Sequence, residues 1–172
     1  FDYRGYGTSK GSPHVKGVFE DSHAAINYVR QRPDVNPDKL AIFGQSLGGT
    51  NAIAAVGSGN QQGIRAVIIE ATFSSYSAIA SDKVSGAGYL MNDDYSAQRF
   101  IANISPIPLV LIHGTQDNVI GLKHSELLYT LAQEPKQLIV VAGGEHIQAF
   151  APKFVKTYQA QLLTFLDSRL RP

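Results

Sequence analysis

One five-residue segment has the residue types and spacing of a nucleophile elbow: Gly44, Gln45, Ser46, Leu47 and Gly48. This Gly-x-Ser-x-Gly pattern carries a serine nucleophile when it turns sharply from a strand into a helix. The β-branched and aromatic residues of 39–43 predict that strand, and the small residues of 46–56 predict the helix. Ser46 is therefore the candidate nucleophile. The structural alternative is a glycine-rich turn in which a serine merely caps a helix.

The tight turn has two expected consequences. It strains the backbone of Ser46, and Gly44 and Gly48 would remove Cβ atoms that otherwise clash. The free N–H groups at a helix N-terminus favour developing negative charge, and we expect the backbone N–H of Leu47 to be the first oxyanion donor.

A serine hydroxyl needs a base to take its proton, and His146 is the candidate. It lies in a loop directly after a predicted strand at 138–141, and it follows Ser46 in the Ser, Asp, His chain order. Of the other histidines, His14 and His23 are expected to cover the surface, and His113 to make a structural hydrogen bond. His124 is expected in the first turn of a helix.

Asp117 is the candidate third member, because it follows the predicted strand 109–112 and can orient a histidine presented by the next strand's loop. Glu70 competes with it, since it also ends a strand. Three further acidic residues are interpreted as solvated loop charges: Asp93, Asp94 and Glu145.

Short β-rich runs alternate with longer helical patterns along the chain, which indicates an α/β fold with a mostly parallel sheet flanked by helices. Strands are expected at 39–43, 65–69, 109–112 and 138–141, with residues 1–3 as the end of another. Helices are expected at 15–32, 46–56, 122–133 and 152–170. The near-continuous apolar strands indicate a sheet that is buried on both faces. Residues 1–172 fit a single domain, in which 73–105 form either a small lid or a plain connection.

Composition excludes several functions. The net charge of +1, without a run of like charges, gives no footprint for nucleic acid. The longest apolar stretches, 108–112 and 138–142, are too short to span a membrane. The chain has no cysteine, so thiolate nucleophiles, disulfides and zinc–thiolate sites are excluded.

With these residues placed, the chain resembles the Bem46-like group of the α/β-hydrolase superfamily, which includes the α/β-hydrolase-domain proteins 13 and 17. The resemblance covers nearly the whole chain. Its motifs are Asp2-Tyr3-Arg4-Gly5-Tyr6-Gly7-Thr8-Ser9, Gly44-Gln45-Ser46-Leu47-Gly48-Gly49, Ile112-His113-Gly114-Thr115-Gln116-Asp117 and Gly144-Glu145-His146. Glu145 departs from the small residue that usually precedes this histidine.

The resemblance implies esterase, thioesterase or peptidase chemistry on a small ester or acyl substrate, without a metal or organic cofactor. It also implies that the chain is the C-terminal portion of the fold. Three strands would precede residues 1–3, and the loop after the third carries a His-Gly motif that supplies the second oxyanion N–H. Some members associate with membranes through upstream segments, so localisation stays open between cytoplasm and membrane.

Without an upstream strand beside it, the strand 39–43 would have an open hydrogen-bonding edge, and open edges favour association. We therefore expect the chain either to pair with another copy or to rearrange. For function, the sequence favours a serine ester or thioester hydrolase. A peptidase with the same three residues and a non-catalytic binding domain of the same fold are the alternatives.

Overall fold

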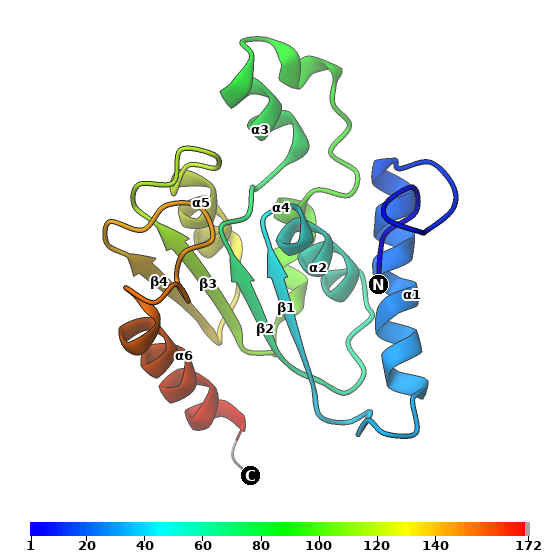
Figure 1. Ribbon diagram of the computed structural model, residues 1–172, viewed down its shortest axis with the longest axis vertical. Coiled ribbons are helices and arrows are strands. Elements are labelled where there is room, and N and C mark those ends of the chain that lie inside the picture. The colour runs from blue at the N-terminus through cyan, green and yellow to red at the C-terminus, as the bar shows by residue number, and fades with distance from the viewer. Residues whose placement is uncertain (171–172) are drawn as a thin grey trace.

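The structure is a computed structural model, and it describes residues 1–170. Four parallel strands form one sheet in the order β1-β2-β3-β4 (Figure 1). They are β1 (Leu40–Gln45), β2 (Ile64–Glu70), β3 (Leu109–Gly114) and β4 (Lys136–Val141). The expected α/β class and parallel sheet are confirmed. Each predicted strand from residue 39 onward is present, with its ends within two residues of the predicted ones.

Helices cover both faces of this sheet. They are α1 (Val15–Gln31), α2 (Leu47–Gly57), α3 (Tyr76–Lys83), α4 (Ala97–Phe100), α5 (Lys123–Leu131) and α6 (Val155–Leu170), with 3-10 turns η1 (Ala87–Leu90) and η2 (Ile101–Ile104). In Figure 1, α1 stands beside β1 at one edge of the sheet and α6 lies by β4 at the other. Within residues 1–170, no helix is long and apolar enough to cross a membrane.

Successive residues along the central strands contribute to core clusters on opposite faces of the sheet. Val67 and Ile69 of β2 belong to the larger cluster, which includes residues of α1, α2, η2 and α5, while Ile68 belongs to a second cluster with residues of α6. Successive strand residues point to opposite faces, so a run that is apolar throughout is the expected result for a sheet that is covered twice.

The prediction of a strand at residues 1–3 is wrong: these residues have no regular secondary structure. A strand needs a neighbour for its backbone N–H and C=O groups. Within the described chain β1 pairs only with β2, so its other edge is open and no strand lies beside residues 1–3. The rearrangement that would have closed this edge is therefore not seen in residues 1–170. Pairing with another copy stays a prediction.

Residues 73–105 contain α3, η1, α4 and η2. Whether this segment acts as a lid or as a connection stays a prediction. In Figure 1, α3 and the segment after it project beyond the end of the sheet. The interpretation of Asp93 as a solvated loop charge is wrong. Its carboxylate accepts hydrogen bonds from the backbone N–H and hydroxyl of Ser77 and from the hydroxyl of Ser96. Asp93 thus joins the two ends of the projecting segment.

A buried histidine fastens α3 to α5. The His124 side chain is 3% exposed; its Nδ1 accepts the backbone N–H of Ser74 at 3.2 Å, and its Nε2 lies 3.0 Å from Asp82 Oδ2. Because Nδ1 accepts, the proton of the neutral ring is on Nε2 and is donated to Asp82. Burial lowers the pKa of His124 from its ordinary value of 6.5, and the hydrogen bond to Asp82 opposes that shift only in part.

This geometry predicts a pH-dependent stability. When the folded pKa of a histidine is depressed, the unfolded chain binds the proton first, so stability is complete above pH 6.5 and is lost as pH falls toward the folded pKa. We expect a lower thermal midpoint at about pH 5.5 than at about pH 7.5. In His124→Gln the pH dependence should shrink. His23, whose pKa is also lowered by burial, acts in the same direction and supplies the residual effect. An unchanged pH dependence in His124→Gln would contradict the assignment.

Candidate active site

Ser46 lies at the junction between β1 and α2, with backbone angles φ 52° and ψ −124°. The positive φ confirms the strain expected at the turn. Neighbours hold this conformation on both sides, because the Ser46 N–H donates to Glu70 O at 2.9 Å and the Thr72 hydroxyl donates to Ser46 O at 2.7 Å. The Ser46 hydroxyl makes no capping hydrogen bond to α2. The helix-cap alternative therefore does not describe this serine.

The two glycines of the elbow differ in what the turn requires. A Cβ on Gly44 would lie 2.6 Å from Gly48 O and 2.8 Å from Gly49 Cα, so Gly44 is needed for the close approach of α2. Apart from its chain neighbours and the nearby backbone of α2, a Cβ on Gly48 would meet no described atom within 4 Å. The expectation that Gly48 prevents a clash is therefore wrong for residues 1–170, because Gly48 faces open space.

These two positions give a matched stability test. Gly44→Ala is expected to lower the free energy of unfolding by about 1–3 kcal/mol, because the new methyl group meets backbone that must shift. Gly48→Ala should leave stability within about 0.5 kcal/mol or increase it, since alanine favours a helix over glycine. Urea denaturation of both variants measures the difference. Equal losses in both would contradict the steric account.

His146 lies in the loop after β4. Its Nε2 is 3.1 Å from Ser46 Oγ, and its Nδ1 is 2.8 Å from Asp117 Oδ2. An ionised carboxylate only accepts hydrogen bonds, so the Nδ1 of His146 carries the proton and Nε2 accepts from the Ser46 hydroxyl. This is the tautomer that can remove a proton from Ser46.

The Asp117 side chain is fully buried and its carboxylate is held by several donors. Oδ1 accepts the backbone N–H groups of Val119 and Ile120, both at 2.9 Å, and Oδ2 faces His146. His113 also lies near this carboxylate, with Nε2 3.3 Å from Oδ2. The two backbone N–H groups and His146 fix the direction of the carboxylate.

Of the other histidines, His113 has the structural role that was expected. It is fully buried, and its Nδ1 lies 2.6 Å from Ser125 Oγ while its Nε2 lies 2.7 Å from Ile120 O. A carbonyl only accepts, so Nε2 carries the proton. His113 thus holds the loop that carries Asp117, a contribution that the sequence did not reveal, although the spacing of four residues between the two is visible in it.

The competing acids lie elsewhere. Glu70 accepts hydrogen bonds from Gln45 Nε2 and from the backbone N–H of Ala149. Asp94 pairs with Arg99 at 3.4 Å, and Glu145 is exposed and accepts from Gln148. The structure thus brings Ser46, His146 and Asp117 together and gives Glu70 other partners.

Leu47 is the first residue of α2, where a backbone N–H has no acceptor within the helix. Leu47 directly follows Ser46, which is the chain position of an oxyanion donor at a nucleophile elbow. Within residues 1–170, no group of three metal-ligating side chains is present.

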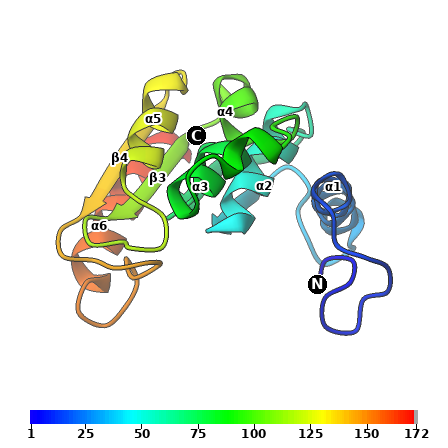
Figure 2. The ribbon, with the colours of Figure 1, turned by 90° about the horizontal axis from the view of Figure 1, so that it is seen from above.

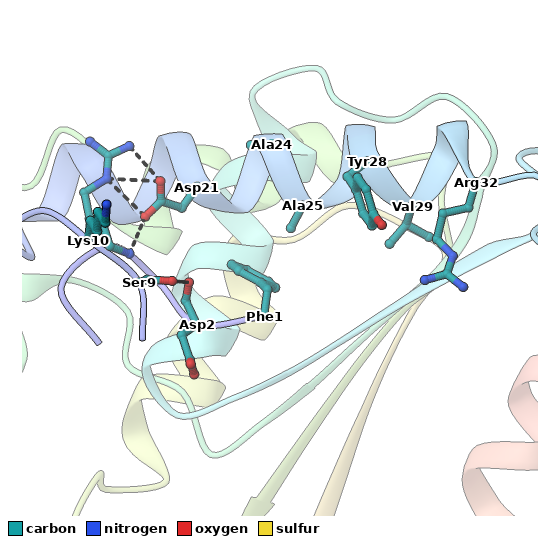
Figure 3. Close-up of a pocket in the computed structure, with 11 residues that line it drawn as sticks. Phe1, Asp2, Ser9, Lys10, Asp21, Ala24, Ala25, Tyr28, Val29 and Arg32 are labelled. Atoms are coloured by element: carbon teal, nitrogen blue, oxygen red, sulfur yellow. Dashed lines mark hydrogen bonds and ion pairs between the residues drawn. The ribbon is translucent and has the colours of Figure 1, made fainter. Parts of the chain in front are cut away.

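Two cavities lie on the β1 side of the molecule. The larger, about 600 Å³, is lined by residues between 1 and 32; Figure 3 shows Asp21 and Tyr28 on α1, with Asp2 and Ser9 on the N-terminal loop across from that helix. The smaller, about 360 Å³, follows the open edge of β1 as far as Gln45 and Gly48. Only the smaller cavity reaches the elbow. Viewed from above, α1 lies at the outer side of the molecule next to α2 (Figure 2), and Ile26 of α1 packs in the same core cluster as residues of α2.

The chain is similar in sequence to known proteins. The model of the prolyl oligopeptidase family matches residues 13–172. The uncharacterized protein YfhR of Escherichia coli O157:H7 is 52% identical over 172 residues, which is 100% of this chain and 61% of that protein. Protein bem46 of Schizosaccharomyces pombe is 32% identical over 139 residues, covering 78% of this chain and 46% of that protein. The chain thus spans less than two thirds of the length of these curated relatives.

Solved structures give the same fold. The α/β hydrolase GrgF of Penicillium matches with a TM-score of 0.76 at 17% identity, over 98% of this chain and 78% of that one. An esterase of Pyrococcus furiosus also matches with a TM-score of 0.76, at 16% identity, over 99% of this chain and 69% of that one. Family match, relatives and fold agree: the chain belongs to the prolyl oligopeptidase family and is a Bem46-like member of the α/β-hydrolase superfamily.

Proposed function

We propose that this protein is a serine hydrolase that cleaves carboxylic esters or thioesters through an acyl-enzyme. Ser46 is the nucleophile, His146 the general base and Asp117 the residue that orients His146. The observation that carries the proposal is the unbroken hydrogen-bond chain from Ser46 Oγ to His146 Nε2 at 3.1 Å and from His146 Nδ1 to Asp117 Oδ2 at 2.8 Å. This chemistry requires the nucleophile to lie within hydrogen-bond distance of the base, and the base to lie within hydrogen-bond distance of the orienting acid.

In the proposed reaction, Ser46 Oγ attacks the carbonyl carbon while its proton moves to His146 Nε2. Asp117 stabilises the imidazolium, and the Leu47 N–H donates to the oxyanion. The tetrahedral intermediate collapses by breaking the bond to the alkoxide or thiolate, which takes the proton from His146. Water then attacks the acyl-enzyme carbonyl while His146 takes its proton. The bond to Ser46 Oγ breaks, Ser46 receives the proton from His146, and the carboxylic acid leaves.

A peptidase with the same residues is the second candidate, and the match to the prolyl oligopeptidase family is the observation that favours it. The two differ in the leaving group that must be protonated and in the pocket that binds the substrate. A non-catalytic binding role would not require the three side chains to be aligned. The alignment therefore favours an enzyme.

A substrate panel separates these functions. Full-length protein would be assayed with p-nitrophenyl esters of two- to eight-carbon acids, with acyl thioesters and with chromogenic peptides, and Ser46→Ala would provide the blank. We expect kcat/KM for an ester or thioester to exceed that for any peptide by more than about 10-fold. A preference for peptides would support the peptidase. Activity that Ser46→Ala retains in full would contradict both functions.

A further inference from the structure

Glu70 is a buried acidic residue for which the proposed reaction has no use. It ends β2 and is only 1% exposed. Its register partners are Gln45 at the end of β1 and Ile112 near the end of β3. Glu70 therefore lies in the middle of the sheet edge from which the three candidate catalytic residues extend.

Three hydrogen bonds connect Glu70 to the segments that carry the nucleophile and the base. Its backbone carbonyl accepts the N–H of Ser46 at 2.9 Å. One carboxylate oxygen, Oε2, accepts from Gln45 Nε2 at 2.7 Å, and the other, Oε1, accepts the backbone N–H of Ala149 at 2.8 Å. Gln45 immediately precedes Ser46, and Ala149 follows His146 by three residues. A single carboxylate thus joins the elbow to the histidine loop.

The backbone is strained at the same places. The non-glycine residues with positive φ in the described chain are Ser46 at 52°, Ala71 at 53° and Ile147 at 51°. Ser46 follows Gln45, Ala71 follows Glu70, and Ile147 lies between His146 and Ala149. Such conformations cost about 1–3 kcal/mol each and persist only where surrounding contacts hold them. The hydrogen bonds of Glu70 lie beside all three.

We propose that Glu70 is a positioning residue: it holds the His146 loop against the nucleophile elbow and so keeps His146 Nε2 within reach of Ser46 Oγ. This inference rests on the proposed function. Glu70 acts through hydrogen-bond acceptance at two oxygens, and its partners are Gln45 and Ala149, not His146. It is therefore distinct from the orienting role of Asp117, and its effect depends on the donor and acceptor pattern more than on its charge.

A swap of the Gln45 and Glu70 side chains tests this in the full-length protein. Glu70→Gln keeps an acceptor for the Ala149 N–H, and its amide faces Gln45, which can turn its own amide to accept. Its kcat should stay within about 3-fold of wild type. In Gln45→Glu the carboxylate of Glu70 faces a second carboxylate in place of an amide. The two groups repel each other, so we expect the nucleophile elbow and the His146 loop to move apart. A misplacement of about 1 Å costs on the order of 100-fold, and we expect kcat to fall about 10- to 100-fold with KM changed less than about 3-fold.

The double variant, Gln45→Glu with Glu70→Gln, restores the pattern. The amide introduced at position 70 donates to the carboxylate introduced at position 45, and its oxygen accepts the N–H of Ala149. Its kcat should therefore recover to within about 3-fold of wild type. The proposal is overturned if Gln45→Glu keeps wild-type kcat, if the double variant does not recover, or if Glu70→Gln alone lowers kcat as much as Gln45→Glu.

Separate controls test whether the variants fold and whether the proposed hydrolase function is correct. Thermal unfolding shows whether each variant folds cooperatively. If Gln45→Glu does not, Gln45→Met replaces it. Gln45 is exposed, and methionine keeps a side chain of similar length while it removes the amide that donates to Glu70. An unchanged kcat in Gln45→Met overturns the positioning role. Ser46→Ala in the same assay distinguishes failure of the proposed function from failure of the role proposed for Glu70. If Ser46→Ala keeps its activity, the proposed function is refuted. If Ser46→Ala loses its activity while the Gln45 variants keep wild-type kcat, only the role of Glu70 is refuted.

Discussion

Asp117→Asn is expected to fold like the wild-type protein and to turn over its ester about 10,000-fold more slowly. The orientation of the new amide follows from the donors around it. Its oxygen must face the backbone N–H groups of Val119 and Ile120, which donate to Asp117 Oδ1 at 2.9 Å each. The NH₂ group then faces His146 Nδ1, which lies 2.8 Å from Asp117 Oδ2.

That arrangement gives His146 the wrong tautomer. An NH₂ group donates, so Nδ1 of His146 must accept and the ring proton moves to Nε2. Nε2 then points an N–H at Ser46 Oγ and cannot take its proton. The loss should appear mainly in kcat, because the substrate still contacts the same surface. Glu145→Gln is the matched control, since it neutralises an exposed carboxylate beside His146 and should change kcat less than about 2-fold. A loss below about 10-fold in Asp117→Asn would show that Asp117 does not orient the base.

Ser46→Ala and His146→Ala are each expected to lower kcat by about 10,000-fold or more, and the double variant should be no slower than the slower single variant. The reason is that the two side chains act as one unit: without the base the hydroxyl is a poor nucleophile, and without the hydroxyl the base has no proton to take. Single-turnover hydrolysis of the preferred ester measures all three variants. Losses that multiply in the double variant would indicate that His146 and Ser46 act in separate steps.

The sequence predicted the parts of the fold that depend on local pattern. The β-branched run Val67-Ile68-Ile69 predicted a doubly covered strand, and Ile68 indeed packs on the face opposite to its neighbours. The failed strand at residues 1–3 has a different cause. A strand is defined by a hydrogen-bonded neighbour, and no strand lies beside those residues within the described chain. Local residue types carry no information about that neighbour.

The candidate site was predictable where strand ends and chain order determine it. Ser46, Asp117 and His146 each follow a strand of one parallel sheet, so their proximity follows from topology. The contacts of Glu70 and His113 were not predictable. Glu70 ends a strand as the candidate residues do, and only the folded chain shows that its acceptors face Gln45 and Ala149. Long-range partners 25 and 79 residues away leave no periodic trace in a single sequence.

The most direct test of the account is covalent labelling of the full-length protein with a fluorophosphonate, followed by mass spectrometry of the labelled peptide. Such reagents react with a serine that a neighbouring base has activated. The account predicts one adduct, on Ser46, that is absent in Ser46→Ala and forms much more slowly in Asp117→Asn. No adduct, or an adduct on another serine, would contradict the central claim that Ser46 is the activated nucleophile.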